Sequence, residues 1–314
     1  MGKIIEKFGM GWLPDYPDFR DYTIDRAEVS TRLERLGQKD SVKTMLTKIG
    51  VAEPARANLP EALSEPVNLR RWCPPIEDQG PLGSCTAHAA VGIVEYFERR
   101  AFNEHIDASR LFLYKATRNM LNWTGDTGAY IRTTMGALVL FGVPPEEYWP
   151  YIIADFDEEP SAFCYAYAQN YQAISYYRLD RRVTPREQLL RRVKRFLAAG
   201  LPSMFGFTVY SSYTQARTTG KIPYPSDGEV RVGGHAVVAV GYDDNMEIEN
   251  TNVDLPSKTT GALLIRNSWG TRWGNEGYGW LPYKYVREGL AVDWWSLLRN
   301  EWVDTEEFKL SGGT

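Results

Sequence analysis

One cysteine of this chain stands where a glycine-rich turn gives way to a helix. Cys85 follows the turn-forming run at residues 80–84 and precedes a stretch of helix-compatible residues. A thiol at the start of a helix lies at the positive end of the helix dipole, where its thiolate is stabilised. Because only the thiolate attacks a carbonyl carbon, this position suits a nucleophile better than a structural cysteine.

A histidine in a strand-like segment is the candidate base. His235 follows two glycines and opens the apolar run 236–240, so its imidazole would be held at a rigid sheet edge, as proton transfer requires. A second apolar run, 262–265, leads to Asn267, which could accept a hydrogen bond from the imidazole and fix its tautomer. Trp269 would shield that bond from water.

His88 is the competing candidate for the base, since it lies three residues after Cys85 on a neighbouring helix face. Together the two residues also have a plausible spacing for metal ligands, but a structural zinc needs four ligands and no second pair is evident. We therefore expect His88 to serve helix packing or hydrogen bonding. No metal and no organic cofactor are predicted.

The order of these residues resembles that of the papain-like cysteine peptidases of the C1 family. Gln79 precedes Cys85, and His235 is followed by Asn267 within an Asn-Ser-Trp-Gly motif. Four separated motifs in this order are a far more specific signal than Gly-Ser-Cys alone. Further support comes from residues 148–151 and 274–278, and the resemblance extends over about residues 59–295.

The resemblance implies a role for each residue. Cys85 would be the nucleophile, His235 the general base and then the general acid, and Asn267 the residue that orients the imidazole. Gln79 would donate its side-chain amide to the oxyanion, beside the backbone N–H of Cys85. The residues expected against the substrate are Gly128 and Ala129, where the family carries a glycine-rich strip, with Gly234 and Trp269 beside the base and amide.

Three positions depart from the family pattern. Leu82 and Asp126 stand where relatives usually carry two cysteines joined as a disulfide, and Thr86 replaces the aromatic residue that normally follows the nucleophile. The cross-link is therefore absent, and we expect packing alone to hold the loop before Cys85. The Gly-Ser-Cys-Thr-Ala pattern looks like the prokaryotic branch of the family.

The implied fold is α+β, papain-like, with a helical subdomain and a β-barrel-like subdomain on either side of an active-site cleft. The expected division is an N-terminal extension at 1–58, a helical subdomain at 59–170 that carries the nucleophile, and a β-rich subdomain at 171–314. The last of these carries the histidine and the asparagine and ends in a C-terminal return segment.

Periodicity and turn residues predict individual elements. The charged segment 29–49 has an incomplete apolar stripe typical of a helix, and Thr184 to Glu187 predicts a capping box that opens a helix ending at Gly200. The other expected helices are 85–100, 109–120 and 131–141, and the expected strands are 203–210, 236–242, 262–267 and 278–286.

Two hypotheses account for the extension at 1–58. The resemblance suggests a short prosegment that lies over the cleft and inhibits the enzyme intramolecularly. The alternative is an integral strap that packs on the core. The extension lacks the long prodomain motif of the eukaryotic relatives.

Composition narrows the partners and the compartment. A net charge of −4 argues against nucleic acid, which needs a concentrated basic face. Three cysteines are too few for a disulfide framework, which favours a reducing compartment. The N-terminus has no apolar signal region, and no apolar window of membrane-spanning length occurs. We expect a cytoplasmic protein without a membrane partner.

The predicted function is a cysteine endopeptidase that hydrolyses peptide or protein substrates through a covalent thioester. A thiolate at Cys85, paired with protonated His235, would attack the peptide carbonyl. Two alternatives stay open: a peptide ligase or transpeptidase, in which an amine resolves the same acyl-enzyme, and a catalytically silent peptide-binding protein of the same fold.

Overall fold

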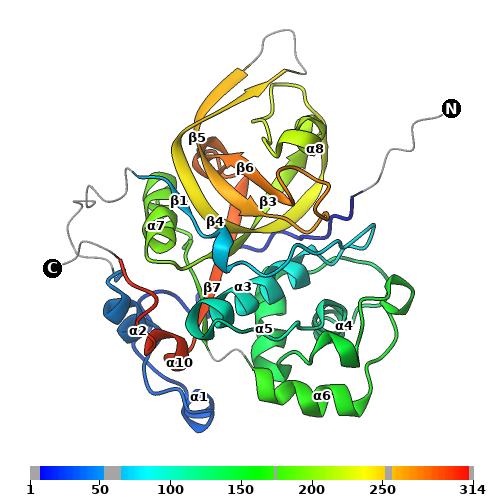
Figure 1. Cartoon of the computed structure of the whole chain (residues 1–314), viewed down its shortest axis with the longest axis vertical. Coiled ribbons are helices and arrows are strands. Elements are labelled where there is room, and N and C mark those ends of the chain that lie inside the picture. Colours follow the sequence, from blue (N-terminus) through cyan, green and yellow to red (C-terminus); the bar gives the residue numbers. More distant parts are fainter. Residues whose placement is uncertain (1–7, 53–64, 173–174, 252–256, 311–314) are drawn as a thin grey trace.

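The computed structural model describes residues 8–52, 65–172, 175–251 and 257–310. A β half and a helical half face each other, and the N-terminal segment runs between them (Figure 1). The longer helices are α3 (Cys85–Phe102), α4 (Arg110–Met120), α5 (Ile131–Phe141) and α7 (Arg186–Ala198). The shorter ones are α1 (Thr31–Arg35), α2 (Val42–Ile49), α6 (Ala162–Ala168), α8 (Ala216–Thr219), α9 (Tyr283–Arg287) and α10 (Asn300–Val303).

The strands form one antiparallel sheet in the order β2-β7-β3-β4-β5-β6, with β1 paired to β4. The α+β fold in two halves is confirmed, but the sheet is open and not closed into a barrel, since its path ends at β2 and β6. The strands are β1 (Val67–Asn68), β2 (Ser175–Arg178), β3 (Ser203–Tyr210), β4 (Arg231–Asn250), β5 (Ser257–Arg266), β6 (Tyr278–Pro282) and β7 (Ala291–Leu298).

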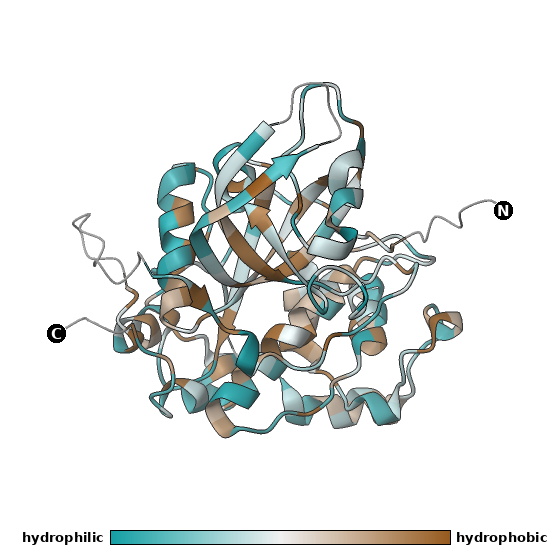
Figure 2. Cartoon of the chain, turned by 45° about the horizontal axis from the view of Figure 1, so that its top comes forward, coloured by the Kyte–Doolittle hydropathy of each residue, from teal (hydrophilic) through white to brown (hydrophobic). Residues whose placement is uncertain are grey.

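Helix α3 is the central element of the helical half. It packs against α4 and α5 on one side and against β4 on the other, and its first thirteen residues are almost all buried. Hydrophobic residues concentrate along the sheet strands and the helices that face them, as Figure 2 shows. A helix buried around most of its circumference holds the residue at its N-terminus in a fixed position.

The predicted helices at 85–100, 109–120 and 131–141 are confirmed by α3, α4 and α5. The predicted helix at 29–49 is two helices, because Gly37 adopts a left-handed φ of 89° and Ser41 caps a new helix by accepting a hydrogen bond from the Thr44 N–H.

Two local predictions were wrong. The strand predicted at 278–286 ends at Pro282, which instead precedes the first residue of α9. The capping box before α7 does not form: the Thr184 hydroxyl accepts from the Arg181 N–H, and Glu187 pairs with Arg287 across to α9. A tertiary ion pair has taken the carboxylate that the local motif would have used.

Within the described ranges, no helix combines the length and the hydrophobicity needed to cross a membrane.

Candidate active site

The N-terminus of α3 meets β4 at the candidate nucleophile. Cys85 is fully buried, and the N–H of Ala236 donates a hydrogen bond to its sulfur at 3.4 Å. Because Ala236 follows His235 directly, this contact brings the thiol of the helical half close to the strand residue that precedes it, the histidine of the β half.

His235 is oriented by Asn267, the first residue after β5. The imidazole Nε2 lies 2.7 Å from the amide oxygen of Asn267, and since that oxygen only accepts, Nε2 donates. The lone pair of the neutral ring is thus on Nδ1, which is buried and has no hydrogen-bond partner among the described residues. Trp269 stacks on the imidazole at 4.3 Å with an interplanar angle of 22°. The arrangement leaves Nδ1 as the nitrogen that can take a proton.

Gln79 is held in one orientation beside the nucleophile loop. Its amide oxygen accepts from the Ser268 hydroxyl at 2.5 Å, and its amide nitrogen donates to the Leu82 carbonyl at 2.7 Å. One N–H of the amide remains to serve an oxyanion. Sequence reasoning missed Ser268, although it lies between Asn267 and Trp269 in the motif already singled out.

A carboxylate supports the loop where the family disulfide is missing. Asp126 accepts two contacts from the Gly83 N–H, at 2.9 and 3.1 Å, and a hydrogen bond from the Tyr114 hydroxyl at 2.6 Å. The prediction that packing alone holds this loop was wrong. The same aspartate that replaces a cysteine supplies a polar link between the two segments.

The side chain of His88 contacts Ser84, the residue just before its own helix. Its Nδ1 lies 3.1 Å from the Ser84 carbonyl oxygen, and its ring meets the ring of Tyr151 edge to face at 4.9 Å. Burial lowers the pKa of His88 to about 3. Tyr151 in turn contacts the Ser84 hydroxyl at 2.6 Å and donates to the Gln79 carbonyl at 3.1 Å. These contacts fit the expected packing role of His88.

Residues 8–13, called the cleft segment from here on, lie between the two walls (Figure 1). Two glycines allow the close approach. A Cβ on Gly9 would fall 2.2 Å from the Leu82 carbonyl oxygen, and one on Gly11 would fall 1.8 Å from that of Gly83. No other residue type fits at these positions without moving the nucleophile loop.

The helical wall pairs with the cleft segment through Ala129. Its N–H donates to the Gly11 carbonyl at 2.8 Å, and its carbonyl accepts from the Leu13 N–H at 3.1 Å, which is a parallel bridge. Gly128, at a left-handed φ of 73°, lies so close that a Cβ would be 2.2 Å from the Gly11 oxygen. Both residues predicted to face substrate backbone face this segment.

The β wall holds the same segment from the other side. The Gly234 carbonyl accepts from the Trp12 N–H at 3.2 Å, and Trp269 donates its indole N–H to the Gly9 carbonyl at 3.0 Å. Phe8 stacks on Trp269 at 4.8 Å. All four residues predicted to line the substrate therefore contact the cleft segment.

The covered site is electrically neutral. Burial raises the pKa of Cys85 to about 11, although N–H groups of Ala236, Gly11 and Trp12 act in the opposite direction. Burial lowers the pKa of His235 to about 4, against the hydrogen bond to Asn267 that raises it. A thiol and a neutral imidazole are the stable forms near pH 7. The helix N-terminus was expected to favour the thiolate of Cys85, but burial outweighs that effect while the cleft segment is in place.

Comparison with known proteins agrees with this geometry. Residues 63–289 match the family described as papain family cysteine protease, and the chain belongs to that family.

Among its relatives is an uncharacterized peptidase C1-like protein of Acanthamoeba polyphaga mimivirus, 33% identical over 91% of this chain and 85% of the viral protein. Xylellain, a cysteine protease from Xylella fastidiosa, has a similar structure with a TM-score of 0.67 at 31% identity, covering 94% of this chain and 97% of that one. Cathepsin K of Gallus gallus is 29% identical over 68% of this chain, which corresponds to 57% of the cathepsin. These matches support a cysteine peptidase from both sequence and fold.

Proposed function

We propose that this chain is a cysteine endopeptidase in which Cys85, His235, Asn267 and Gln79 perform the chemistry, and that the cleft segment holds it in a latent form. The observation that carries the proposal is the single tautomer imposed on His235. Nε2 donates to Asn267, Nδ1 has no partner among the described residues, and the N–H of the adjacent Ala236 donates to the thiol. A fixed imidazole with its lone pair free is what a general base requires.

The chemistry follows from these positions. Nδ1 of His235 takes the proton of Cys85, and the thiolate attacks the peptide carbonyl carbon. The oxyanion is stabilised by the amide of Gln79 and the backbone N–H of Cys85. The imidazolium then protonates the leaving amine, and water activated by the same imidazole hydrolyses the thioester. Asn267 keeps the ring in place throughout.

The orientation of the cleft segment favours inhibition over cleavage. Near the sulfur it presents the N–H groups of Gly11 and Trp12, which act to lower the pKa of the thiol, whereas attack requires a carbonyl carbon. With the segment in this position, Cys85 is fully buried. An intramolecular inhibitor bound in this way blocks substrate without being consumed.

The course of the cleft segment also supports endopeptidase action. At one end of the segment Phe8 lies against Trp269, and at the other end Leu13 pairs with Ala129. A chain that continues in both directions is thus accommodated. The likeness to xylellain over most of both chains supports the prokaryotic type of the family.

The test uses the full chain with Trp12→Ala, which should weaken docking of the cleft segment, and a fluorogenic peptide. In this background Cys85→Ala should abolish turnover, and Asn267→Ala and Gln79→Ala should each lower kcat/KM about 100-fold or more. Cys164→Ala is the matched control, since that cysteine is buried in a separate small cluster with Phe112. Mass analysis of the products with an added amine separates hydrolysis from ligation. Turnover that survives Cys85→Ala would contradict the proposal.

A further inference from the structure

Trp12 fills a hollow that three neighbouring strands form beside the candidate base. Its side chain is buried, with 3% of the residue exposed. The hollow lies between β4, β3 and β7, which are adjacent in the sheet. Gly234, which holds the Trp12 N–H, directly precedes His235. The hollow therefore lies next to the reacting groups, on the β wall.

Two glycines give the hollow its size. A Cβ on Gly206 of β3 would fall 1.9 Å from Cε2 of the Trp12 indole, and one on Gly234 would fall 2.9 Å from its Cε3. Any larger residue at Gly206 would occupy the volume of the ring itself. The hollow is thus shaped for a wide, flat side chain.

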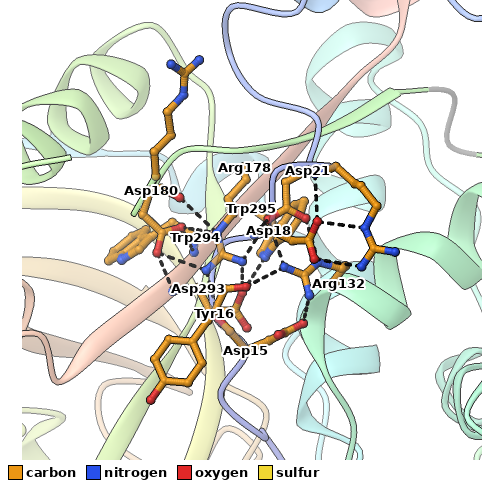
Figure 3. Close-up of polar contacts among 12 residues, drawn as sticks. Asp15, Tyr16, Asp18, Asp21, Arg132, Arg178, Asp180, Asp293, Trp294 and Trp295 are labelled. Carbon is orange, nitrogen blue, oxygen red and sulfur yellow. Dashed lines mark hydrogen bonds and ion pairs between the residues drawn. The ribbon is translucent and has the colours of Figure 1, made fainter. Parts of the chain in front are cut away.

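A buried carboxylate forms the polar end of the hollow. Asp293 is fully buried; its Oδ2 accepts from the Trp12 indole N–H at 3.1 Å, and its Oδ1 accepts from the Trp295 indole N–H at 2.7 Å. Arg178 lies 3.3 Å from Oδ1, and Figure 3 shows its guanidinium beside Asp293 and Trp295. Arg178 also pairs with Asp180 and Asp21, so it is shared among three carboxylates. What Asp293 offers to the hollow is one acceptor oxygen.

The backbone aims this carboxylate. Asp293 has a left-handed φ of 63° at a point where the register between β3 and β7 shifts, and such bulges redirect a side chain. The N–H groups of Asp293 and Trp294 donate to the Asp180 carboxylate at 3.0 and 2.9 Å. Asp180 is itself paired with Arg178 at 2.9 Å. Two buried charged partners thus hold this uncommon backbone conformation in place, and with it the position of the Asp293 carboxylate.

We propose that this hollow is a substrate subsite, and that Asp293 makes it select peptides carrying tryptophan, whose place Trp12 takes in the latent form. The inference rests on the proposed peptidase function. It sharpens the expectation of an apolar subsite beside Gly234, because Asp293, distant in sequence, adds a requirement for one N–H donor.

Competing side chains meet a physical penalty in this hollow. An apolar ring without an N–H leaves Oδ2 buried and unpaired, which lowers affinity on the order of 10- to 100-fold. A cationic side chain would have to give up its water in this buried hollow and lie near the guanidinium of Arg178, which is 3.3 Å from the same carboxylate. A neutral flat donor such as indole suits both the shape of the hollow and its single acceptor.

The test measures kcat/KM of the full chain carrying Trp12→Ala. A peptide set with tryptophan at successive positions finds the subsite, and the best peptide is then remade with 3-benzothienylalanine, which has the shape of tryptophan but sulfur in place of the N–H. We expect tryptophan to be preferred about 10- to 100-fold. Asp293→Asn, which tolerates the left-handed backbone, should reduce that preference to less than about 3-fold, because its single acceptor oxygen cannot serve both indoles.

Gly206→Ala tests the shape of the hollow independently of the carboxylate. It should exclude tryptophan and 3-benzothienylalanine alike, in favour of small side chains. Equal turnover of the two bulky peptides by the Trp12→Ala chain, or a preference for arginine, would overturn the inference while leaving the peptidase intact. Absence of any turnover above that of Cys85→Ala, in a chain whose Cys85 is alkylated by iodoacetamide near pH 5 and is therefore accessible, would instead contradict the proposed function, and with it this inference.

Discussion

The cleft segment and the stretch that follows it are held to the body by opposite kinds of contact. Residues 8–13 use backbone hydrogen bonds, glycine contacts and one indole. Residues 15–25, called the anchor segment from here on, use carboxylates that pair with the buried Arg178 and the half-buried Arg132 (Figure 3). Both belong to one continuous extension, yet only the first lies over the thiol.

The anchor is built around Asp21, whose side chain is 4% exposed. Its two carboxylate oxygens accept from Arg132 of α5 at 2.7 and 3.0 Å, and it also lies 3.4 Å from Arg178 of β2. Asp15 adds an ion pair with Arg132. The anchor thus joins the extension to both halves of the molecule.

Because of this difference, the cleft segment can leave the active site without the anchor segment leaving the body of the protein. Removing one partner of a buried ion pair leaves an uncompensated charge, whereas the hydrogen bonds of the cleft segment can be replaced by water or by a substrate backbone. We infer that the cleft can open while the anchor stays in place. The two hypotheses for the extension, a prosegment and a strap, then describe two parts of one segment.

The largest expected effect is on activity, from Trp12→Ala in the full chain. Losing the buried indole should weaken docking of the cleft segment and raise peptidase activity about 100-fold. Trp12→Phe keeps a ring and loses the N–H to Asp293, so a rise of about 10-fold is expected. Initial rates with a fluorogenic peptide measure both. Equal activity of all three chains would show that the indole does not hold the cleft shut.

Asp21→Asn should change stability and leave activity nearly unchanged. It should lower the free energy of unfolding by about 2 to 3 kcal/mol, because hydrogen bonds from charged groups are weakened, although Arg132 keeps Asp15 and Arg178 keeps Asp180. Little gain in activity is expected. Asp18→Asn is the matched control in the same segment, since Asp18 pairs with the largely exposed Arg20 and should show no measurable change. Urea unfolding gives the free energy of unfolding of the wild type, Asp21→Asn and Asp18→Asn. A large gain in activity without loss of stability in Asp21→Asn would contradict the claim that the anchor segment provides stability while the cleft segment controls access to the thiol.

A smaller effect is expected at the nucleophile loop. Asp126→Ala removes the acceptor of the Gly83 N–H and should cost about 1 to 2 kcal/mol of stability, whereas Asp126→Asn, which keeps one acceptor oxygen, should cost less. Thermal melts monitored by circular dichroism give both values. Identical melting of all three proteins would return the support of this loop to packing alone.

The sequence was most informative where chemistry demands particular residue types in a fixed order. Cys85, His235, Asn267 and Gln79 are brought together in space as the resemblance implied, because a helix start and two apolar strands are local patterns. Failures came where a distant partner decides the outcome. Glu187 is drawn away from its helix cap by Arg287, and no local signal predicts that pair.

The occupant of the cleft could not be predicted for the same reason. Trp12 lies in a proline-broken run without periodicity, and its partner Asp293 is distant along the chain. The left-handed backbone that aims Asp293 depends on Asp180 from another segment. Only the two glycines before His235 hinted at an open wall, and they said nothing of the acceptor behind it.

Alkylation of Cys85 by iodoacetamide as a function of pH tests the central claim that the cleft segment keeps the thiol neutral. The raised pKa of Cys85, about 11, and the lowered pKa of His235, about 4, leave almost no thiolate at pH 5 to 7 in the native chain. The account predicts negligible modification of the native chain in this range and rapid modification near pH 5 in Trp12→Ala, where water returns and the ion pair can form. Equal rapid alkylation of both chains at pH 5 would contradict it.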